Sequence, residues 1–366
     1  RAAAAELKDR VRSRLVQFDE CLSGQRTPES EVETVVCSTD TARRARRVTA
    51  AHNEFDSATI TTIHGFAQQV LGTLGSASPT DPDAVLLDDT ADLVRQVATD
   101  MLVTEALLGE HPDADVPSLD DLVGITLQTL GNPGAVVVPG TDPADSSDAA
   151  ALMRTMVDQV CEGVRLRRLS AGTMSFDDLL VRLRSAVQDP ASGPSTCALL
   201  RDRFRIALID EFQDTDPVQW GIFRTVFADE PASGEARSTL VLVGDPKQAI
   251  YGFRGANVHT YLQAAHAPGT DRVGLNRNWR SDPAVLDATA RLLAGSSFGH
   301  PDITFSTVTA ANADEDRRAR TEDGDPFPAL SIRVADHEDL EPKKEHLSVD
   351  AAAKVSFAEM AVHVRN

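Results

Sequence analysis

The sequence has few cysteines and no long apolar run. Its four cysteines are scattered and form no CxxC pair; they are Cys21, Cys37, Cys161 and Cys197. This usage argues against a zinc site or a disulfide framework and favours a reducing compartment, so we expect a cytoplasmic protein. No uninterrupted apolar stretch approaches the ~18 residues of a membrane span, so no membrane partner is expected.

Basic residues are also scarce. The 366-residue chain has 36 Lys and Arg against 56 Asp and Glu, a formal net charge of −20. Taken alone, this charge argues against a nucleic-acid partner, because phosphate binding needs a basic surface. Net charge says nothing about local patches, however, so each candidate site has to be judged on its own residues. The length is sufficient for two or three domains.

Apolar side chains recur at helical spacing in many segments. Ser175 followed by Asp178 is an acidic variant of the capping box and predicts the start of another helix. The β-branched residues 58–63 predict a short strand that leads through His64 into a helix. The helices predicted from periodicity cover residues 1–22, 66–74, 84–108, 119–130, 149–169, 217–226 and 348–364.

Two further apolar runs predict strands of a parallel sheet. Residues 206–209 and 240–243 are apolar without alternation, which is typical of strands covered on both faces. The helix predicted between them completes a βαβ unit. Ligands bind at the carboxyl ends of such strands, so we expect functional residues there.

Two acidic residues, Asp210 and Glu211, follow the first of these strands. In nucleoside triphosphatases such a pair supplies one carboxylate for Mg²⁺ and a second that polarises the attacking water. The alternative is a helix N-terminus, which acidic residues also favour. That alternative would prevail for a bare Asp-Glu pair, but Gln213, Asp214 and Thr215 follow and the second strand ends in matching chemistry.

The segment after the second strand combines an amide, two aromatic rings and a guanidinium. Gln248 is a long neutral amide that can contact both a phosphate and a water. Tyr251, Phe253 and Arg254 form the combination that stacks bases and pairs phosphates of single-stranded nucleic acid. Packing of the aromatic rings against the sheet is the alternative, but aromatic residues make up only 5% of the chain, which makes this cluster notable.

These strings resemble motifs of superfamily 1 DNA helicases of the UvrD/RecB type. Motif II is matched by ALIDEFQDTDPVQ at residues 207–219, and motif III by LVLVGDPKQAIYGFRGA at residues 240–256. The other matches are LNRNWRSDPAVL at residues 275–286 (motif IV), TTIHGFAQQVL at residues 61–71 (a motif that contacts single-stranded DNA), residues 1–15 (the tail of motif Ia) and FDDLL at residues 176–180, whose wording is closest to the RecB branch.

The resemblance implies a role for each matched residue at the nucleotide. Asp210 would bind Mg²⁺ and Glu211 would activate the hydrolytic water. Gln248 would contact the γ-phosphate of ATP and couple its loss to domain movement. Trp279 would stack on adenine, although a core anchor is its ordinary role. Arg280 would act as an arginine finger on the γ-phosphate.

The resemblance also implies a path for single-stranded DNA, lined by Thr62, His64, Tyr251, Phe253 and Arg254. A lone histidine is more often a surface or core residue, but the surrounding TIHGF string favours a DNA contact for His64. The basic run at residues 43–47 is first a solvated helix face and only second a candidate contact to the DNA backbone.

The fold that the resemblance implies is α/β, a RecA-like parallel sheet of the P-loop NTPase type. A mostly helical insertion would interrupt this sheet, and a second RecA-like domain would begin near the end of the chain. Residues 1–74 would start domain 1A, residues 75–200 would form insertion domain 1B, residues 201–270 would complete domain 1A, and residues 271–366 would begin domain 2A with a linker.

The phosphate-cradling GxxxxGK[ST] loop is missing from the sequence, and the chain starts at Arg1 rather than Met. We therefore expect a fragment that hydrolyses ATP poorly alone. Neither the later helicase motifs V and VI nor a nuclease carboxylate cluster is matched. The intact parent would be an ATP-dependent 3′-to-5′ DNA helicase of double-strand-break repair, acting on single-stranded and duplex DNA with RecC-like and RecD-like subunits.

Two other functions stay open. A non-catalytic DNA-binding or regulatory remnant would use the strand-end residues only to hold the fold. A generic Mg²⁺-dependent phosphohydrolase is the weaker alternative, because it accounts for neither the NWRS string nor the TIHGF string.

Overall fold

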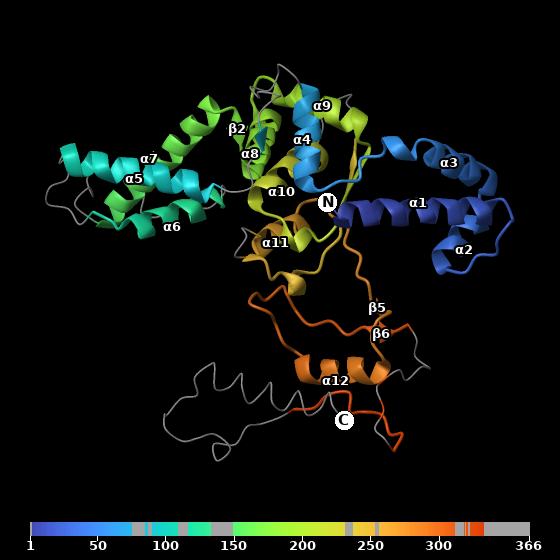
Figure 1. The fold of residues 1–366 in the computed structure, drawn as a ribbon. Helices are drawn as coiled ribbons and strands as arrows, with labels where there is room; N and C mark the ends of the chain where they lie inside the picture. Colours follow the sequence, from blue (N-terminus) through green and yellow to red (C-terminus); the bar gives the residue numbers. More distant parts are fainter. Residues whose placement is uncertain are drawn as a thin grey trace, which may run out of the picture. The chain divides into compact units, whose positions relative to one another are not determined.

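The structure is a computed structural model (Figure 1). It describes residues 2–74, 85–86, 90–108, 116–132, 149–230, 237–252, 256–311, 318, 320 and 323–332. The chain divides into two compact units, Arg1–Ala264 and Ala265–Asn366. No helix among the described residues is long and apolar enough to cross a membrane.

Three helices at the start of the chain pack on one another, α1 (Ala2–Leu22), α2 (Glu31–Ser38) and α3 (Thr41–Asn53) (Figure 1). The first of them confirms the helix predicted for residues 1–22. The basic run at residues 43–47 lies on α3, which has no buried residue. Three arginines of the run, Arg43, Arg46 and Arg47, are exposed, whereas Arg44 is half-buried and donates to the carbonyl of Val36 at 2.9 Å.

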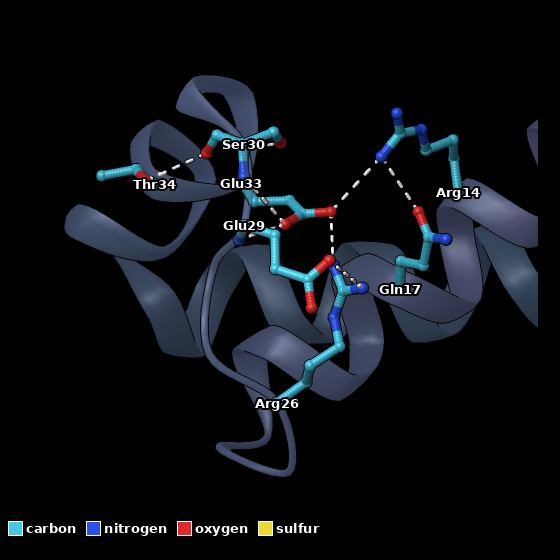
Figure 2. Close-up of polar contacts among 7 residues, drawn as sticks. All are labelled: Arg14, Gln17, Arg26, Glu29, Ser30, Glu33 and Thr34. Carbon is cyan, nitrogen blue, oxygen red and sulfur yellow. Dashed lines mark hydrogen bonds and ion pairs between the residues drawn. The ribbon is translucent and has the colours of Figure 1, made fainter.

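A buried carboxylate joins α1 to α2 (Figure 2). The side chain of Glu33 is only 2% exposed and pairs with Arg14 at 3.3 Å and with Arg26. It also accepts the backbone N–H of Glu29 at 2.7 Å, and it forms a capping box with Ser30 at the start of α2. Burial of a charge is costly unless it is paired and hydrogen-bonded, and Glu33 meets both conditions.

The sheet of the first unit has two parallel strands among the described residues, β3 (Ile206–Ile209) and β4 (Thr239–Leu242). In the register of the pair, Ile206 lies opposite Thr239. Both strands were predicted from their apolar runs, the second with a shift of one residue. The structure is thus α/β, with many helices and small parallel sheets.

One hydrophobic core covers a single face of this sheet. Its largest fully buried side chains include Leu180, Leu183, Leu200, Phe212 and Ile222. The helices that supply the core are α4 (Ile63–Leu74), α8 (Phe176–Gln188), α9 (Gly193–Arg203), α10 (Pro217–Phe223) with the π-helical turn Arg224–Ala228 that follows it, and α11 (Val258–Ala265).

Two predictions about strands are wrong. Residues 58–62 form no strand, and α4 begins directly after them, because β-branched residues hold a strand only where a neighbouring strand pairs with them. The strands β3 and β4 are not covered on both faces either. Leu208 is 71% exposed and Val241 37%, whereas Ile209 on the opposite face is 7% exposed. In the described part of the chain, the helices pack against one face only.

A second core lies within three helices, α5 (Ala91–Leu108), α6 (Leu119–Leu130) and α7 (Ala149–Ser170). They confirm the helices predicted at 84–108, 119–130 and 149–169, the first of which begins later than expected. Beside them, β1 (Val85–Leu86) pairs in parallel with β2 (Thr173–Met174).

The predicted capping box at the start of α8 is confirmed. The hydroxyl of Ser175 accepts the N–H of Asp178 at 3.2 Å, and the Asp178 carboxylate accepts the N–H of Ser175 at 2.8 Å. The buried Arg168 of α7 also binds this carboxylate at 3.0 Å. The cap therefore ties α7 to α8.

The second unit contains one short parallel pair and one helix among its described residues. The strands are β5 (Arg277–Asn278) and β6 (Thr309–Ala310), and the helix is α12 (Pro283–Leu293). The helix predicted at residues 348–364 lies outside the described residues.

Candidate active site

The carboxyl ends of β3 and β4 are joined by backbone hydrogen bonds beyond the strands. The N–H of Val243 donates to the carbonyl of Ile209 at 2.8 Å, and the N–H of Phe212 donates back to Val243 at 2.9 Å. The loops that begin at Asp210 and at Gly244 therefore lie side by side. This is the edge at which parallel sheets bind ligands.

Glu211 has a left-handed backbone, with φ 53° and ψ 41°. Among the described residues, the only other non-glycine with positive φ is Asp40. Such a conformation is strained for a residue with a side chain and is concentrated at functional sites. The N–H of Glu211 is held by the carboxylate of Asp210 at 3.0 Å, and both side chains are exposed.

Gln213 connects the two loops. Its side chain is 2% exposed. Its amide Nε2 donates to Oε2 of Glu211 at 2.6 Å, and its Oε1 accepts the N–H of Asp245 at 3.0 Å. The sequence predicted no role for Gln213, which stood there only as part of a string. Its partner at Asp245 is a backbone N–H 32 residues away, so no local pattern marks the contact.

Gly244 lets the two loops approach each other closely. A Cβ atom at this position would lie 2.6 Å from Oε1 of Gln213 and 3.1 Å from the backbone nitrogen of Phe212. The first of these distances is shorter than real Cβ atoms adopt, so a side chain here would displace Gln213. Glycine is therefore required by space rather than by backbone angle.

Asp245 organises the loop that carries Gln248. Its carboxylate binds Nζ of Lys247 at 2.8 Å and accepts the amide of Gln248 at 3.4 Å. Burial disfavours the charged form of Asp245, but the hydrogen bonds and charge of Lys247 outweigh it, so the pKa of Asp245 is lowered. The Gln248 side chain, predicted to contact a phosphate, is exposed.

Asp214 follows Gln213 in the loop after β3 and has a different environment. Its Oδ1 is buried and has no hydrogen-bond partner in the structure. Burial, and after it the negative charge of Glu211, raise the pKa of Asp214. The pKa of Asp214, in the loop after β3, is thus raised, whereas that of Asp245, in the loop after β4, is lowered, and such opposed shifts are typical of active sites.

His64 lies at the start of α4 against the FDDLL segment of α8. Its ring meets Phe176 edge-on at 5.8 Å, and its Nε2 is 3.9 Å from Oδ1 of Asp177. Asp216, which caps α10, belongs to the same region, and burial raises its pKa against the opposing backbone hydrogen bonds of Gln219 and Val218. His64 is thus part of a packed cluster, although a third of its side chain is exposed.

Of the other four predicted DNA contacts, the structure describes two. The hydroxyl of Thr62 accepts the N–H of Gly65 at 3.2 Å in the first turn of α4. Tyr251 is 39% exposed. Phe253 and Arg254 lie outside the described residues.

Trp279 and Arg280 belong to the second unit. Trp279 is 64% exposed, so it is not a core anchor, and the guanidinium of Arg277 lies 4.9 Å from its ring centre. The side chain of Asn278 accepts the backbone N–H groups of Arg280 and Ser281, both at 2.8 Å. This turn fixes the backbone of Arg280 directly after the exposed ring.

The donor set at the end of β3 fits magnesium. Mg²⁺ binds oxygen, keeps several waters, and is usually held by one or two carboxylates plus substrate phosphates. Asp210 and Glu211 offer exposed carboxylate oxygens of this kind. In the described part of the chain, no cluster of three or more His, Cys, Asp or Glu side chains could hold a metal by itself.

Comparison with known proteins extends these observations. A family model described as the UvrD/REP helicase N-terminal domain matches residues 1–268. The RecBCD enzyme subunit RecB of Mycolicibacterium smegmatis is 35% identical over 363 residues, which are 97% of this chain and 32% of that protein. RecB of Mycobacterium tuberculosis (strain H37Rv) is 34% identical over 97% of this chain and 32% of its own length.

Similarity to RecB of Escherichia coli covers a smaller part, at 37% identity over 185 residues, 49% of this chain and 15% of that protein. The chain spans about a third of the length of the mycobacterial relatives. The family match includes both strand ends and the loops that Gln213 connects. The chain therefore belongs to the UvrD/REP helicase family.

Proposed function

We propose that this chain is part of the motor of an ATP-dependent, 3′-to-5′ DNA helicase similar to RecB, which acts in double-strand-break repair and recombination. The family match and the similarity to RecB subunits over 97% of the chain support this proposal. Those relatives are named as subunits of a RecBCD enzyme, so single-stranded and duplex DNA and RecC-like and RecD-like subunits are the proposed partners. The proposed compartment is the cytoplasm.

The strained Glu211 beside Asp210 is the observation that carries the proposal. A left-handed glutamate costs of order 1–3 kcal/mol and persists where the surrounding structure holds it for a purpose. In the proposed reaction Glu211 orients and activates the attacking water. Asp210 holds Mg²⁺, which supplies charge neutralisation at the phosphates when bound.

The remaining site residues receive roles from the same proposal. Gln248 contacts the γ-phosphate and relays its loss. Trp279 stacks its exposed ring on adenine, and the guanidinium of Arg280 stabilises the negative charge of the γ-phosphate in the transition state. The proposed path of single-stranded DNA is lined by Thr62, His64, Tyr251, Phe253 and Arg254.

The proposed domain arrangement follows the family pattern. Residues 1–74 and 201–270 belong to a RecA-like domain 1A, residues 75–200 to an insertion domain 1B, and residues 271–366 to the start of domain 2A. Closure of two such domains around ATP is a hinge transition that can drive movement along DNA.

The test is Glu211→Gln in the longest natural form of the protein, assayed for DNA-stimulated ATP hydrolysis. Removing a general base costs roughly 10²–10⁴-fold in turnover, while ATP binding should survive because the substitution removes no phosphate contact. Glu230→Gln is the control, since Glu230 is exposed and pairs only with Arg237 among the contacts described. Normal turnover by Glu211→Gln would refute the assignment.

A regulatory remnant is the second candidate. The 366 residues contain no GxxxxGK[ST] loop, and in a remnant the strand-end residues would serve the fold alone. Our proposal expects the 366-residue chain by itself to hydrolyse ATP poorly. The coding sequence upstream of Arg1 separates the two candidates: a GxxxxGK[ST] motif shortly before Arg1 supports the motor, whereas a start codon close before Arg1, with no such motif, supports the remnant.

A further inference from the structure

Gln213 is a buried polar side chain whose two partners belong to different loops. It is 2% exposed, and buried amides are retained where they are hydrogen-bonded. The partners fix which way the amide faces. The carboxylate of Glu211 can only accept, so it meets the NH₂ group, and the N–H of Asp245 can only donate, so it meets the oxygen.

The surroundings pack closely around this amide. The amide fits against Gly244 only because that residue has no side chain, since a Cβ atom there would lie 2.6 Å from Oε1 of Gln213. Phe212, next to Gln213, is 1% exposed and is held by the rings of Trp220 and Tyr261 at 5.6 and 6.1 Å. The hydroxyl of Tyr261 donates to the carbonyl of Gly244 at 3.4 Å, so Tyr261 contacts both Phe212 and the loop that begins at Gly244. We call the pair of hydrogen bonds from Gln213 to Glu211 and Asp245 the bridge.

We propose that Gln213 is a positioning residue that sets the orientation of the Glu211 carboxylate and ties it to the loop of residues 244–248. A displacement of that loop, which continues into Tyr251, would then move Glu211 through a single amide. This inference rests on the proposed function for the role of Glu211. It adds a direct link between the segment proposed to contact DNA and the group proposed to activate water.

Two variants separate the two bonds of the bridge. Gln213→Leu removes both while keeping a side chain of similar size. Gln213→Glu keeps the oxygen that accepts from Asp245 but sets a carboxylate against Glu211.

The first readout needs no catalysis. Amide hydrogen exchange at Asp245 in the 366-residue chain should accelerate by roughly fivefold or more in Gln213→Leu, because its acceptor is lost, and should stay near the wild-type rate in Gln213→Glu. Gln188→Leu is the control, since Gln188 is exposed and its amide reaches only Thr225 among the contacts described. Unchanged exchange at Asp245 in Gln213→Leu would overturn the bridge.

The second readout is ATP hydrolysis by the longest natural form. Misplacing a catalytic group by about 1 Å costs roughly a hundredfold in kcat, so Gln213→Leu should lose kcat while the KM for ATP stays unchanged. Gln213→Glu, which sets a second carboxylate against Glu211, should also lose kcat. Wild-type kcat in both variants would overturn the positioning role even if Glu211→Gln is inactive.

The two proposals fail separately. If the wild type hydrolyses no ATP, the proposed function is refuted and amide exchange alone decides the bridge. If Gln213→Leu does not fold, as judged by circular dichroism, the kcat of Gln213→Glu decides the positioning role: a loss of kcat supports it, and wild-type kcat overturns it.

Discussion

Replacing Gly244 by alanine tests how tightly the two strand-end loops are packed. The new Cβ atom would lie 2.6 Å from Oε1 of Gln213 and 3.2 Å from its backbone nitrogen. The amide must therefore swing away and lose its bond to Asp245. Overpacking costs ~1–3 kcal/mol and a lost hydrogen bond ~0.5–1.5 kcal/mol. Alanine returns ~0.4–1 kcal/mol by restricting the unfolded chain, so the net loss should lie between ~0.5 and ~4 kcal/mol, with a central value of about 2 kcal/mol.

The assay follows Trp220 during urea unfolding. The chain has two tryptophans, so a Trp279→Phe background leaves Trp220 as the only indole reporter. This ring is 6% exposed and lies against Phe212, directly beside the loops in question.

Gly124→Ala is the matched control for this experiment. Gly124 is inside α6 and has no atom within 4 Å of an added Cβ, so alanine there should stabilise by up to ~1 kcal/mol. An unfolding free energy of Gly244→Ala equal to or above that of the background, with Gly124→Ala stabilised as expected, would refute the packing argument.

Three further predictions concern stability. Leu183→Ala, at a side chain that is 1% exposed, should cost ~2–5 kcal/mol in urea unfolding, whereas Leu166→Ala, at a 52% exposed position, should be close to neutral. Ser175→Ala removes the cap of α8 and should cost ~1 kcal/mol; an unchanged unfolding midpoint would contradict the role of the cap. The backbone N–H of Glu29, against the opposing effect of burial, and then the charge of Arg26 lower the pKa of Glu33. Its contribution to stability is therefore complete above the unfolded pKa of ~4.3 and is lost as the pH falls through the folded pKa, so the stability difference between wild type and Glu33→Gln should shrink on acidification. A difference that is constant with pH would be evidence against the ion pairs of Glu33.

Local sequence signals predicted the elements whose stability is local. The capping residues Ser175 and Asp178 marked the start of α8, because a cap is formed by side chains within one turn. The apolar runs of β3 and β4 and the acidic pair after β3 were equally visible. Segment 58–62 was mispredicted as a strand because a strand needs a partner, and no local pattern reports one.

The sequence predicted which residues follow the two strands, but it did not predict the hydrogen bonds that connect the two loops. Asp210, Glu211 and Gln248 follow the strands as expected, since the end of a strand is visible in the sequence. The bridge through Gln213 was missed because its partner at Asp245 is 32 residues away and is a backbone N–H, which no side-chain pattern encodes. The left-handed backbone of Glu211 was not predicted either, because glycine is the residue whose presence in a sequence usually indicates that conformation.

The uncovered face of the sheet has a practical consequence for work with this chain. Ile206 and Leu208 on β3 and Val241 on β4 present apolar side chains to water. Exposed patches of this kind promote self-association. The apparent stability of the purified chain should therefore rise with protein concentration. Light scattering should detect the self-association, and an apolar dye should fluoresce when it binds to the exposed face.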